Sequence, residues 1–435
     1  MDYQQMNGKS CSCGKVHSFQ ETVCIGAGTV NGLADHIRSL GGSKAFILTD
    51  KNTFQAAGER VCDLLKKESI PFTSYSFSHF PVEPDEYSVG NAVMHFDRSC
   101  DVIVGVGSGV INDISKILSS MTKAAYIIVA TAPSMDGYAS ASSSMNRDGL
   151  KISLPSRGAD VIIGDTDILC QAPLHMMKSG LGDMLAKYIS ICEWRIANLI
   201  TGEYYCEEIA QLIRTAVKKC VDNANGLLQR DPAAVEAVFE GLVIGGIAMN
   251  YAGLSRPASG VEHYISHIID MRGLEFGTPV ELHGIQCAIG TLLAIEVYEK
   301  LLLVHPDKEK AVAYAERFNY NAWEQILRDY LGKSAESMIA LEEIEGKYDP
   351  SDHKVRLDII LSHWDQILAI VKEELPTYHK LRAQMAALGM PLTLEDMKIP
   401  QQNFSTIFKC TKDIRDKYVL SRLLWDLGIL DEMFA

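Results

Sequence analysis

The sequence predicts a two-part α/β protein, with a parallel sheet and crossover helices in the N-terminal third and a helical region after it. Two observations predict this class. Short β-rich runs alternate with helix-like segments between residues 22 and 130, and this order is typical of parallel strands joined by helices. After Pro173 long helical patterns follow one another with few strand signals. The change of pattern predicts a boundary near Cys170–Pro173.

The expected strands of the first part are short and mostly apolar. The runs Ile103–Val106 and Ile127–Ala130 are apolar throughout, as in strands that helices cover on both faces. Residues 146–149 (Asn-Arg-Asp-Gly) predict a hairpin turn. A further strand could follow at Val161–Gly164. The expected strands are Thr22–Ile25, Ala45–Thr49, Phe72–Phe77, Asp101–Val106 and Tyr126–Ala130.

Helices are expected between these strands and throughout the second part, where the apolar positions recur at helical spacing. From these patterns we expect an α/β domain at residues 21–171 and a helical domain at residues 172–435. The expected helices are Gly32–Leu40, Glu59–Glu68, Ile114–Met121, His175–Ala197, Tyr204–Leu228, Pro232–Tyr251, Gly260–Met271 and His283–Val304, with more toward the C-terminus.

The composition is that of a globular protein with an acidic surface. Of the 435 residues, 47% are apolar and 22% are charged, close to the average for globular domains. Lysine and arginine number 41 against 55 acidic residues, so the formal charge is −14. Such a surface repels nucleic acids and anionic lipids, so we expect neither as a partner. Any anion site must be built from backbone N–H groups or a few local cations.

The N-terminal segment and the cysteines favour a cytoplasmic location. Residues 1–20 are polar and lack the apolar core of a signal peptide, and no apolar run reaches the roughly 18 residues of a membrane span. The 11 cysteines are then expected to be reduced. Cys11, Cys13 and His17 could form a metal clip, but their spacing fits no common zinc pattern and a fourth ligand is not evident. We therefore expect residues 1–20 to be a flexible N-terminus.

Two features near the N-terminus suggest a nucleotide-binding site, but each also has a purely structural explanation. Gly26-Ala-Gly28 follows the first strand and Gly32 comes four residues later, close to a dinucleotide-binding glycine pattern without matching it. A near-match by itself is weak, and a plain tight turn into a helix is the favoured interpretation. Asp50 ends the second strand, where a carboxylate can accept a hydrogen bond from a ribose hydroxyl. An ordinary strand-end aspartate is the alternative.

A stronger indication of an anion-binding site lies at Gly107-Ser108-Gly109. These residues end an apolar strand, and a helical pattern begins directly after them. Glycine lets the backbone approach a pyrophosphate, and a helix N-terminus offers N–H groups to it. The alternative is a glycine turn needed for packing alone. Thr131-Ala-Pro-Ser134-Met-Asp136 follows the next strand, so it should project from the same sheet edge. There it could bind nucleotide or substrate, or be a capped turn.

A third set of polar residues is spread over the helical part. His263 and His267 are four residues apart and so share one helix face. Asp183 and His283 lie at other glycine breaks. One carboxylate and two imidazoles from these three helices form a plausible ligand set for a divalent metal and leave positions for a substrate oxygen and water. Histidines buried in a core are the alternative. Arg256 could hold a phosphate through charge-assisted hydrogen bonds, or be a surface arginine.

These motifs resemble the glycerol-1-phosphate dehydrogenases, particularly their bacterial branch. That family lies in the superfamily of glycerol dehydrogenase, iron-type alcohol dehydrogenases and dehydroquinate synthase. The resemblance covers roughly Cys24 to Glu299. The sequences that carry it are GSGVINDISK from Gly107, TAPSMDGYAS from Thr131, GLGDMLAKY from Gly180 and SRPASGVEHYISH from Ser255.

The resemblance implies a Rossmann-like N-terminal domain and an all-helical C-terminal domain, as in dehydroquinate synthase, with the active site in a cleft between them. It implies one divalent metal ion (zinc or nickel, with iron possible) on Asp183, His263 and His283. Asp136, Asp183 and His267 would touch substrate. NAD or NADP would lie on Asp50, Gly107, Ser108, Gly109, Val110, Ile111, Asn112, Asp113, Thr131, Ala132, Pro133, Ser134 and Ser140.

The function implied is metal-dependent interconversion of dihydroxyacetone phosphate and sn-glycerol 1-phosphate with NAD(P)H, for glycerolipid biosynthesis. The phosphate would lie on Arg256, and the enzyme would be a homo-oligomer, a dimer or larger. Ile285 stands where much of the superfamily carries glutamate, which argues against dehydroquinate synthase chemistry. The alternatives are a dehydrogenase of glycerol or another polyol, and a non-catalytic nucleotide-binding protein.

Overall fold

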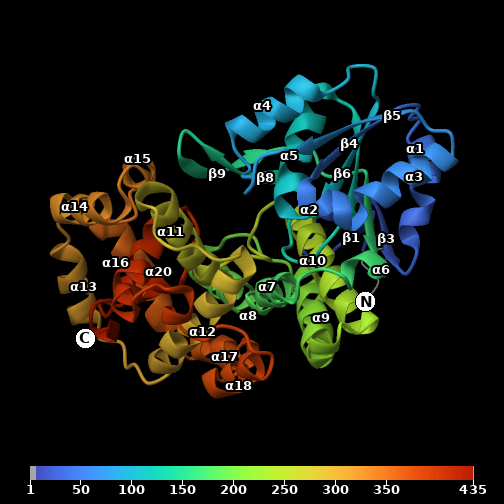
Figure 1. Cartoon of the computed structure of the whole chain (residues 1–435). Coiled ribbons are helices and arrows are strands. Elements are labelled where there is room, and N and C mark those ends of the chain that lie inside the picture. The colour runs from blue at the N-terminus through green and yellow to red at the C-terminus, as the bar shows by residue number, and fades with distance from the viewer. Residues whose placement is uncertain (1–5, 435) are drawn as a thin grey trace. The chain divides into compact units, whose positions relative to one another are not determined.

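The computed structural model describes residues 6–434. The chain forms two compact units (Figure 1). The sheet unit comprises Met1–Met184 and Gln211–Leu254, and the helical unit comprises Leu185–Ala210 and Ser255–Ala435.

A six-stranded parallel sheet forms the centre of the sheet unit, which confirms the predicted α/β class. The five expected strands are present with ends within one residue of those predicted, and the run from Val161 is the sixth strand. In spatial order the strands are β3 (Thr22–Gly26), β10 (Val161–Asp165), β7 (Ala125–Ala130), β6 (Val102–Gly107), β4 (Ala45–Asp50) and β5 (Phe72–Phe77).

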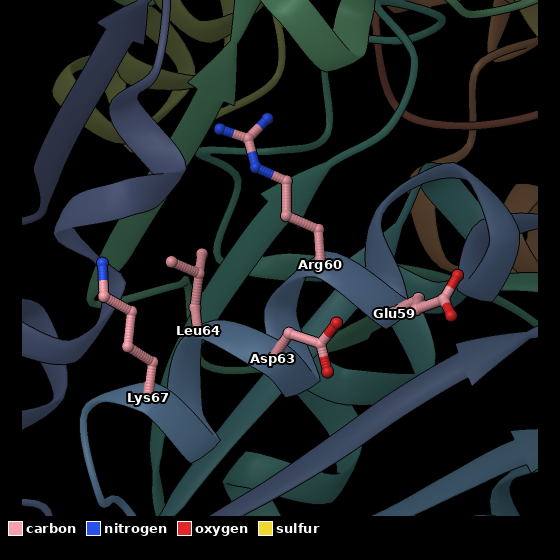
Figure 2. A pocket seen from close by; sticks show the side chains of 5 residues that line it. All are labelled: Glu59, Arg60, Asp63, Leu64 and Lys67. Atoms are coloured by element: carbon pink, nitrogen blue, oxygen red, sulfur yellow. The ribbon is translucent and has the colours of Figure 1, made fainter.

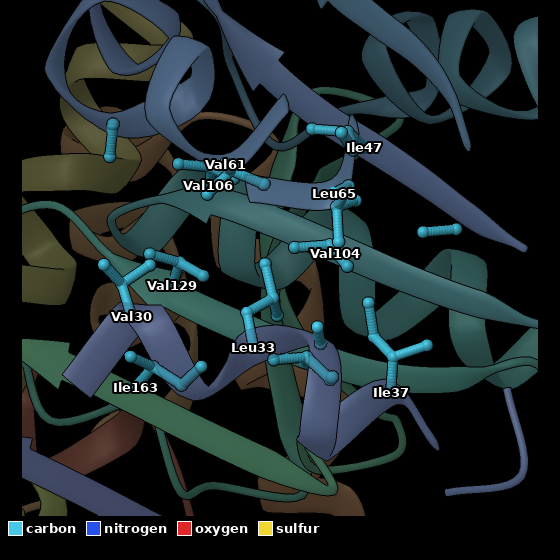
Figure 3. Close-up of a cluster of buried hydrophobic side chains, with 14 of the residues drawn as sticks. Val30, Leu33, Ile37, Ile47, Val61, Leu65, Val104, Val106, Val129 and Ile163 are labelled. Atoms are coloured by element: carbon cyan, nitrogen blue, oxygen red, sulfur yellow. The ribbon is translucent and has the colours of Figure 1, made fainter. Parts of the chain in front are cut away.

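Both faces of this sheet are buried, which explains why its central strands are apolar throughout. On one face Val104 and Val129 pack with Leu33 of α1 (Leu33–Ser39) and Val61 of α3 (Glu59–Lys67) (Figure 3). Alternate residues such as Ile103 point to the other face and are also fully buried. Burial of each such side chain contributes about 1.5–3 kcal/mol.

The strand order reverses between β4 and β6. From β4 the chain continues to β5 on one side, whereas from β6 it continues to β7 and β10 on the other. In open α/β sheets ligands bind outside the carboxyl ends of the strands at such a reversal. Asp50 and Gly107 end these two strands, so the fold places both beside the expected ligand position.

The remaining elements of the sheet unit are helices around the sheet and two small hairpins. The predicted turn in the second hairpin is confirmed, because Asp148 (φ 54°) and Gly149 (φ 77°) both adopt the left-handed conformation. These elements are β1 (Lys9–Ser10), β2 (Val16–His17), η2 (Thr29–Gly32), α2 (Lys51–Thr53), η3 (Phe54–Gly58), α4 (Glu86–His95), α5 (Gly109–Thr122), β8 (Ser142–Arg147), β9 (Leu150–Pro155), α6 (Thr166–Leu169), α7 (Leu174–Leu185), the larger part of α9 (Glu207–Asn223), η4 (Ala224–Gln229) and α10 (Pro232–Ala252).

Helix α10 is long and apolar enough to cross a membrane, and within residues 6–434 no other helix is. Its mean hydropathy is 1.5 over the most apolar window, and 72% of that window is buried inside the protein. The core helix of a globular domain has the same composition. Its Phe239 ring occupies the space beside Gly164 in β10, since a Cβ on that glycine would lie 2.1 Å from the ring.

The grouping of α10 with the sheet differs from the predicted division of the chain. The sequence prediction assigned everything after residue 171 to the helical domain, whereas residues 211–254 pack with the sheet unit. The physical reason is that α10 packs against β3 and α6. The assignment of functional domains to residues 21–171 and 172–435 stays a prediction. So does the flexibility of residues 1–20, of which 1–5 lie outside the described residues and part of the rest forms the β1–β2 hairpin.

Helices make up the helical unit, as predicted. The expected helix at His175–Ala197 is divided at Ala186 into α7 and α8. The helices are α8 (Lys187–Thr201), α11 (Val261–Phe276), α12 (His283–Leu301), α13 (Lys308–Glu316), α14 (Tyr320–Leu331), α15 (Ser334–Glu345), α16 (Pro350–Ser362), α17 (Trp364–Glu374), α18 (Tyr378–Ala387), η5 (Glu395–Met397), η6 (Gln401–Asn403), α19 (Phe404–Cys410), η7 (Thr411–Asp413), α20 (Leu420–Asp426) and η8 (Glu432–Phe434).

The packing of Phe239 on Gly164 is testable. We expect Gly164→Ala to lower the free energy of unfolding by about 1–3 kcal/mol, because the added methyl group overpacks the sheet against α10. Urea unfolding followed by circular dichroism measures the change. Gly90→Ala is the matched control, because no atom lies within 4 Å of a Cβ there. Equal midpoints for both variants would contradict the account of this contact.

Candidate functional site

The glycine turn after β6 has the geometry of an anion-binding loop. Ser108 lies between β6 and α5 in an extended conformation, and no side chain caps the N-terminus of α5. Unpaired N–H groups at a helix N-terminus attract anions. A Cβ on Gly107 would lie 2.5 Å from the Cβ of Ile111, so the close turn requires glycine there.

The segment after β7 lies directly beside this turn, as the sequence predicted. Its first residue, Thr131, donates its backbone N–H to the carbonyl of Gly107 at 3.0 Å. The hydroxyls of Ser108 and Ser134 are 2.5 Å apart. The Tyr138 hydroxyl donates to the carbonyl of Ala132 at 2.6 Å, which fixes the shape of the segment between them.

Other residues predicted to bind cofactor have partners inside the protein. The Asn112 amide donates to the carbonyl of Gly137 at 3.0 Å, and Ile111 is buried. Burial raises the pKa of Asp113, although Lys116, 3.0 Å from its carboxylate, acts to lower it. The Ser140 hydroxyl lies 3.0 Å from that of Ser142. The side chains of Asn112 and Asp113 therefore make contacts within the protein. Cofactor contact stays a prediction for all the residues named as cofactor-binding.

Asp50 lies at the predicted edge position, but its side chain also has a structural task. Its carboxylate accepts from the backbone N–H of Thr53 at 2.8 Å, and its own N–H donates to the Thr53 hydroxyl at 2.9 Å. This reciprocal cap starts α2. An aspartate in this position can still offer its second oxygen to a ribose.

The turn at Gly26-Ala-Gly28, which is close to a dinucleotide-binding glycine pattern, binds a carboxylate of the protein itself. Asp165, at the end of β10 and fully buried, accepts from the N–H groups of Gly28 at 3.0 Å and Val30 at 3.1 Å. The turn therefore binds Asp165 in the way a phosphate loop binds phosphate, which favours the plain-turn interpretation. The sequence analysis missed Asp165, although an acidic residue directly after the apolar run Val161–Gly164 was a visible signal.

Within the sheet unit Asp136 and Asp183 are brought together. Asp183 is fully buried on α7 and accepts from the backbone N–H of Asp136 at 2.9 Å. Oxygens of the two carboxylates lie within 4.8 Å of each other. Helix α7 holds this arrangement because Gly180 lies against the carbonyl of Pro133, which a Cβ would approach to 1.9 Å. The Ser179 hydroxyl donates to the carbonyl of Ser134 at 2.9 Å.

Within the helical unit the predicted histidines also come together. The rings of His263 and His283 are 5.1 Å apart, and that of His267 is 6.2 Å from His283. His263 places its Nδ1 2.7 Å from Glu262, and His283 places its Nδ1 3.1 Å from the Ser266 hydroxyl. Such partners orient an imidazole and leave Nε2 to act as a metal ligand.

Cys287 belongs to this histidine cluster, and the sequence analysis missed it. Its Sγ lies within 4.8 Å of nitrogens of both His263 and His283. Burial acts to raise the pKa of this thiol, but the neighbouring His263 and His283 lower it below its usual value. The signal was the spacing, because residues 283 and 287 share one helix face.

Two buried carboxylates support the start of α11. Glu193 accepts from the backbone N–H of Val261 at 2.9 Å and from that of Leu420 at 2.8 Å. Burial, and then the charge of Glu262, raise the pKa of Glu193 to about 8. Glu262 in turn accepts from the backbone N–H of Gly260 at 2.8 Å, so the two carboxyl groups together hold the end of α11 that carries His263.

Arg256 is buried and paired in this structure. Its guanidinium lies 2.6 Å from Glu203 and donates to the carbonyl of Tyr418 at 2.9 Å. Its predicted role in binding phosphate stays a prediction. The neighbouring Lys417, which the sequence analysis missed, donates to the hydroxyl and carbonyl of Ser259, both at 2.9 Å.

The residues present fit a divalent metal ion. Carboxylate oxygens and imidazole nitrogens suit zinc, nickel and iron alike. The sheet unit supplies Asp183 and the helical unit supplies His263 and His283. The joint use of these three residues as ligands stays a prediction.

A surface depression elsewhere on the sheet unit has no comparable chemistry. Its lining residues all come from the outer side of α3, as Figure 2 shows: Glu59, Arg60, Asp63, Leu64 and Lys67. Side chains of mixed charge on one helix do not converge on a ligand, so the loops at the sheet edge remain the stronger candidate.

The chain is similar in sequence to known dehydrogenases. The family model described as "Iron-containing alcohol dehydrogenase" matches residues 24–173. The glycerol-1-phosphate dehydrogenase [NAD(P)+] of Geobacillus thermodenitrificans is 32% identical over 65% of this chain and 70% of its own length. The protein of the same name from Bacillus licheniformis is 26% identical over 97% of this chain and 93% of its own length.

Solved structures show the same fold. Glycerol dehydrogenase from Schizosaccharomyces pombe matches with a TM-score of 0.63 at 16% identity, covering 98% of this chain and 92% of its own. Maleylacetate reductase from Agrobacterium tumefaciens matches with a TM-score of 0.63 at 15% identity, covering 95% of this chain and 96% of its own. These matches show the fold, and the sequence relatives at 31–32% identity show the family: the chain belongs to the glycerol-1-phosphate dehydrogenase [NAD(P)+] family.

Proposed function

We propose that this protein is an NAD(P)-dependent oxidoreductase that interconverts dihydroxyacetone phosphate and sn-glycerol 1-phosphate. Membership of the family carries this proposal, because relatives at 30–32% identity bear that name. The glycine turn at the strand-order reversal supports the nucleotide part, and the oriented imidazoles support the metal part. A cytoplasmic homo-oligomer that supplies glycerolipid synthesis is the setting this proposal implies.

The cofactor would lie with its pyrophosphate on the turn at Gly107–Gly109. Backbone N–H groups there can bind an anion without a net cation, which suits a protein of charge −14. Asp50, at the end of the neighbouring strand, would accept from a ribose hydroxyl. A carboxylate there disfavours a 2′-phosphate, so the proposal favours NAD over NADP.

The ion would be held by Asp183, His263 and His283. A bound divalent ion supplies Lewis-acid stabilisation of negative charge on the substrate oxygen. The chain prepares these ligands itself, since Glu262 and Ser266 hold the imidazoles by Nδ1 and the Asp136 N–H orients Asp183. His267 would exchange a proton with the substrate hydroxyl, for which its neutral form must be accessible.

The substrate phosphate would lie near Lys417. The charges of Arg256 and Arg415 lower the pKa of Lys417, whereas those of Glu262 and Asp416 raise it. Desolvation, and then these two arginines, lower the pKa of Lys417 to about 7. A phosphate dianion would offset both effects. Because Arg256 is already paired with Glu203, Lys417 is the better candidate for direct contact.

A polyol dehydrogenase is the second candidate. The Arg256–Glu203 pair favours it, because an arginine already paired with a carboxylate is less available to a substrate phosphate. A substrate panel separates the two candidates by NAD(P)H absorbance, with several divalent ions added back. The proposal expects much higher kcat/KM for dihydroxyacetone phosphate and glycerol 1-phosphate than for dihydroxyacetone and glycerol. Equal or greater efficiency with glycerol would contradict it.

Loss of a metal ligand should abolish turnover while the fold survives. We expect Asp183→Asn and His263→Ala to lose bound divalent metal and to lower kcat/KM at least about 100-fold. Metal analysis by mass spectrometry and steady-state kinetics measure both effects, and circular dichroism checks the fold. The exposed His95 provides the control variant His95→Ala. Full activity in a thoroughly chelated, metal-free protein would overturn the metal assignment.

Binding of the phosphorylated substrate should weaken as the pH rises through about 7. Lys417 is charged below its pKa and neutral above it, so KM should rise by up to about tenfold per pH unit above that value. Steady-state kinetics between pH 6 and 9, in roughly half-unit steps, measure it. Lys417→Arg keeps the charge and should flatten the profile, while ionisation of the substrate is common to both proteins. An equally steep profile in Lys417→Arg would remove Lys417 from the phosphate site.

A further inference from the structure

We propose that Cys11, Cys13 and His17 bind a zinc ion at the turn of the β1–β2 hairpin, separate from the ion of the catalytic site. In the sequence the spacing Cys-x-Cys-x3-His matched no common zinc pattern. The folded hairpin brings one ligand atom from each of these residues within 4.8 Å of the others.

The hairpin explains how such a short spacing works. Strands β1 and β2 pair in antiparallel register, with Lys9 opposite His17. The turn is closed by the N–H of Cys11, which donates to the carbonyl of Lys15 at 2.9 Å. Gly14 adopts φ 83°, which glycine adopts without strain. The two cysteines of the turn and the histidine of the returning strand therefore face one point.

The spacing of the ligand atoms suits zinc. The Sγ of Cys13 lies 3.4 Å from the Nε2 of His17. In a tetrahedral site with usual Zn–S and Zn–N bond lengths, a sulfur and a nitrogen ligand are about 3.5 Å apart. The fourth position remains for a water molecule or for another cysteine of the chain.

The histidine is also held in the tautomer that a metal needs. The Nδ1 of His17 lies 2.9 Å from the backbone carbonyl of Tyr251. A carbonyl can only accept, so Nδ1 must carry a proton, which leaves Nε2, beside Cys13, as the ring nitrogen available to a metal. Metal-binding histidines are held in this way by a carbonyl or carboxylate. His17 is buried, with 1% of its surface exposed, so the ring cannot turn freely to water.

The ion would close the N-terminal hairpin, and His17 and Lys15 attach this hairpin to the end of α10. Lys15 reaches the carbonyl of Ala252 at 3.5 Å, and the His17 ring lies 5.4 Å from that of Tyr251. Both partners belong to the last turn of α10, in the sheet unit. The apolar side chain of Val16 in the returning strand is exposed, and in small folds a metal commonly replaces a core.

Another cysteine–histidine pair of the sheet unit provides the matched comparison. The Sγ of Cys24 lies 3.4 Å from the Nε2 of His36, the same separation as between Cys13 and His17. Among the residues the structure describes, no third ligand completes that pair into a candidate metal group. Cys24→Ser therefore removes an equivalent contact without removing a proposed ligand.

The test is the metal content of the full-length protein, purified with zinc and freed of loosely bound ions by gel filtration. The His263→Ala background isolates the proposed ion from the catalytic one. We expect Cys13→Ser and His17→Gln to lower zinc by one equivalent per chain, and Cys24→Ser to leave it unchanged. Unchanged zinc in the Cys13→Ser and His17→Gln proteins would overturn the proposal. Each variant is compared with the His263→Ala protein, so the expected loss of one zinc equivalent does not depend on whether His263 binds metal.

Cobalt provides the second readout. After exchange of zinc for Co²⁺, a thiolate-to-cobalt charge-transfer band is expected in the near ultraviolet. The band should persist in Cys287→Ser, which removes the thiol beside His263 and His283, and in Cys24→Ser. It should be lost in Cys13→Ser. A band that follows Cys287 alone would assign the thiolate to the histidine cluster and contradict the hairpin site.

Discussion

Helix α7 approaches the loop after β7 more closely than a side chain would permit, and the candidate site depends on this approach. The carbonyl of Pro133 occupies the space where Gly180 would carry a Cβ. This contact and the Ser179–Ser134 hydrogen bond tie α7 to the loop that borders the glycine turn. Asp183, one turn further along α7, is thereby fixed against the N–H of Asp136. One backbone contact thus sets the proposed metal carboxylate in a defined position beside the proposed cofactor loop.

In the helical unit, polar side chains orient the proposed metal-binding histidines. Imidazoles are useful ligands only when their rings are oriented, and Glu262 and Ser266 hold His263 and His283 by Nδ1. Glu193 and Glu262 are buried together beneath the start of α11, an arrangement that raises the pKa of Glu193. The N–H groups at that helix start offset part of the cost. Burying two carboxyl groups is costly without such partners.

The fold was largely predictable from local patterns, because strands buried on both faces leave continuous apolar runs such as Ile103–Val106. The glycine turn and the histidine pair were predictable for a similar reason, since each is a short-range pattern. The pairing of Arg256 with Glu203 was not, because it joins residues 53 positions apart. The grouping of α10 with the sheet likewise depends on long-range packing, which no local pattern contains. The acidic residue Asp165 stands out in the local sequence, but its partners Gly28 and Val30 lie 137 and 135 positions away.

The most direct test of the central claim is the stereochemistry of the product. The purified protein is incubated with dihydroxyacetone phosphate, NADH and a divalent ion, and the glycerol phosphate formed is resolved on a chiral column. The account predicts sn-glycerol 1-phosphate in an amount equal to the NADH consumed. The opposite enantiomer, or no glycerol phosphate with any divalent ion, would contradict it.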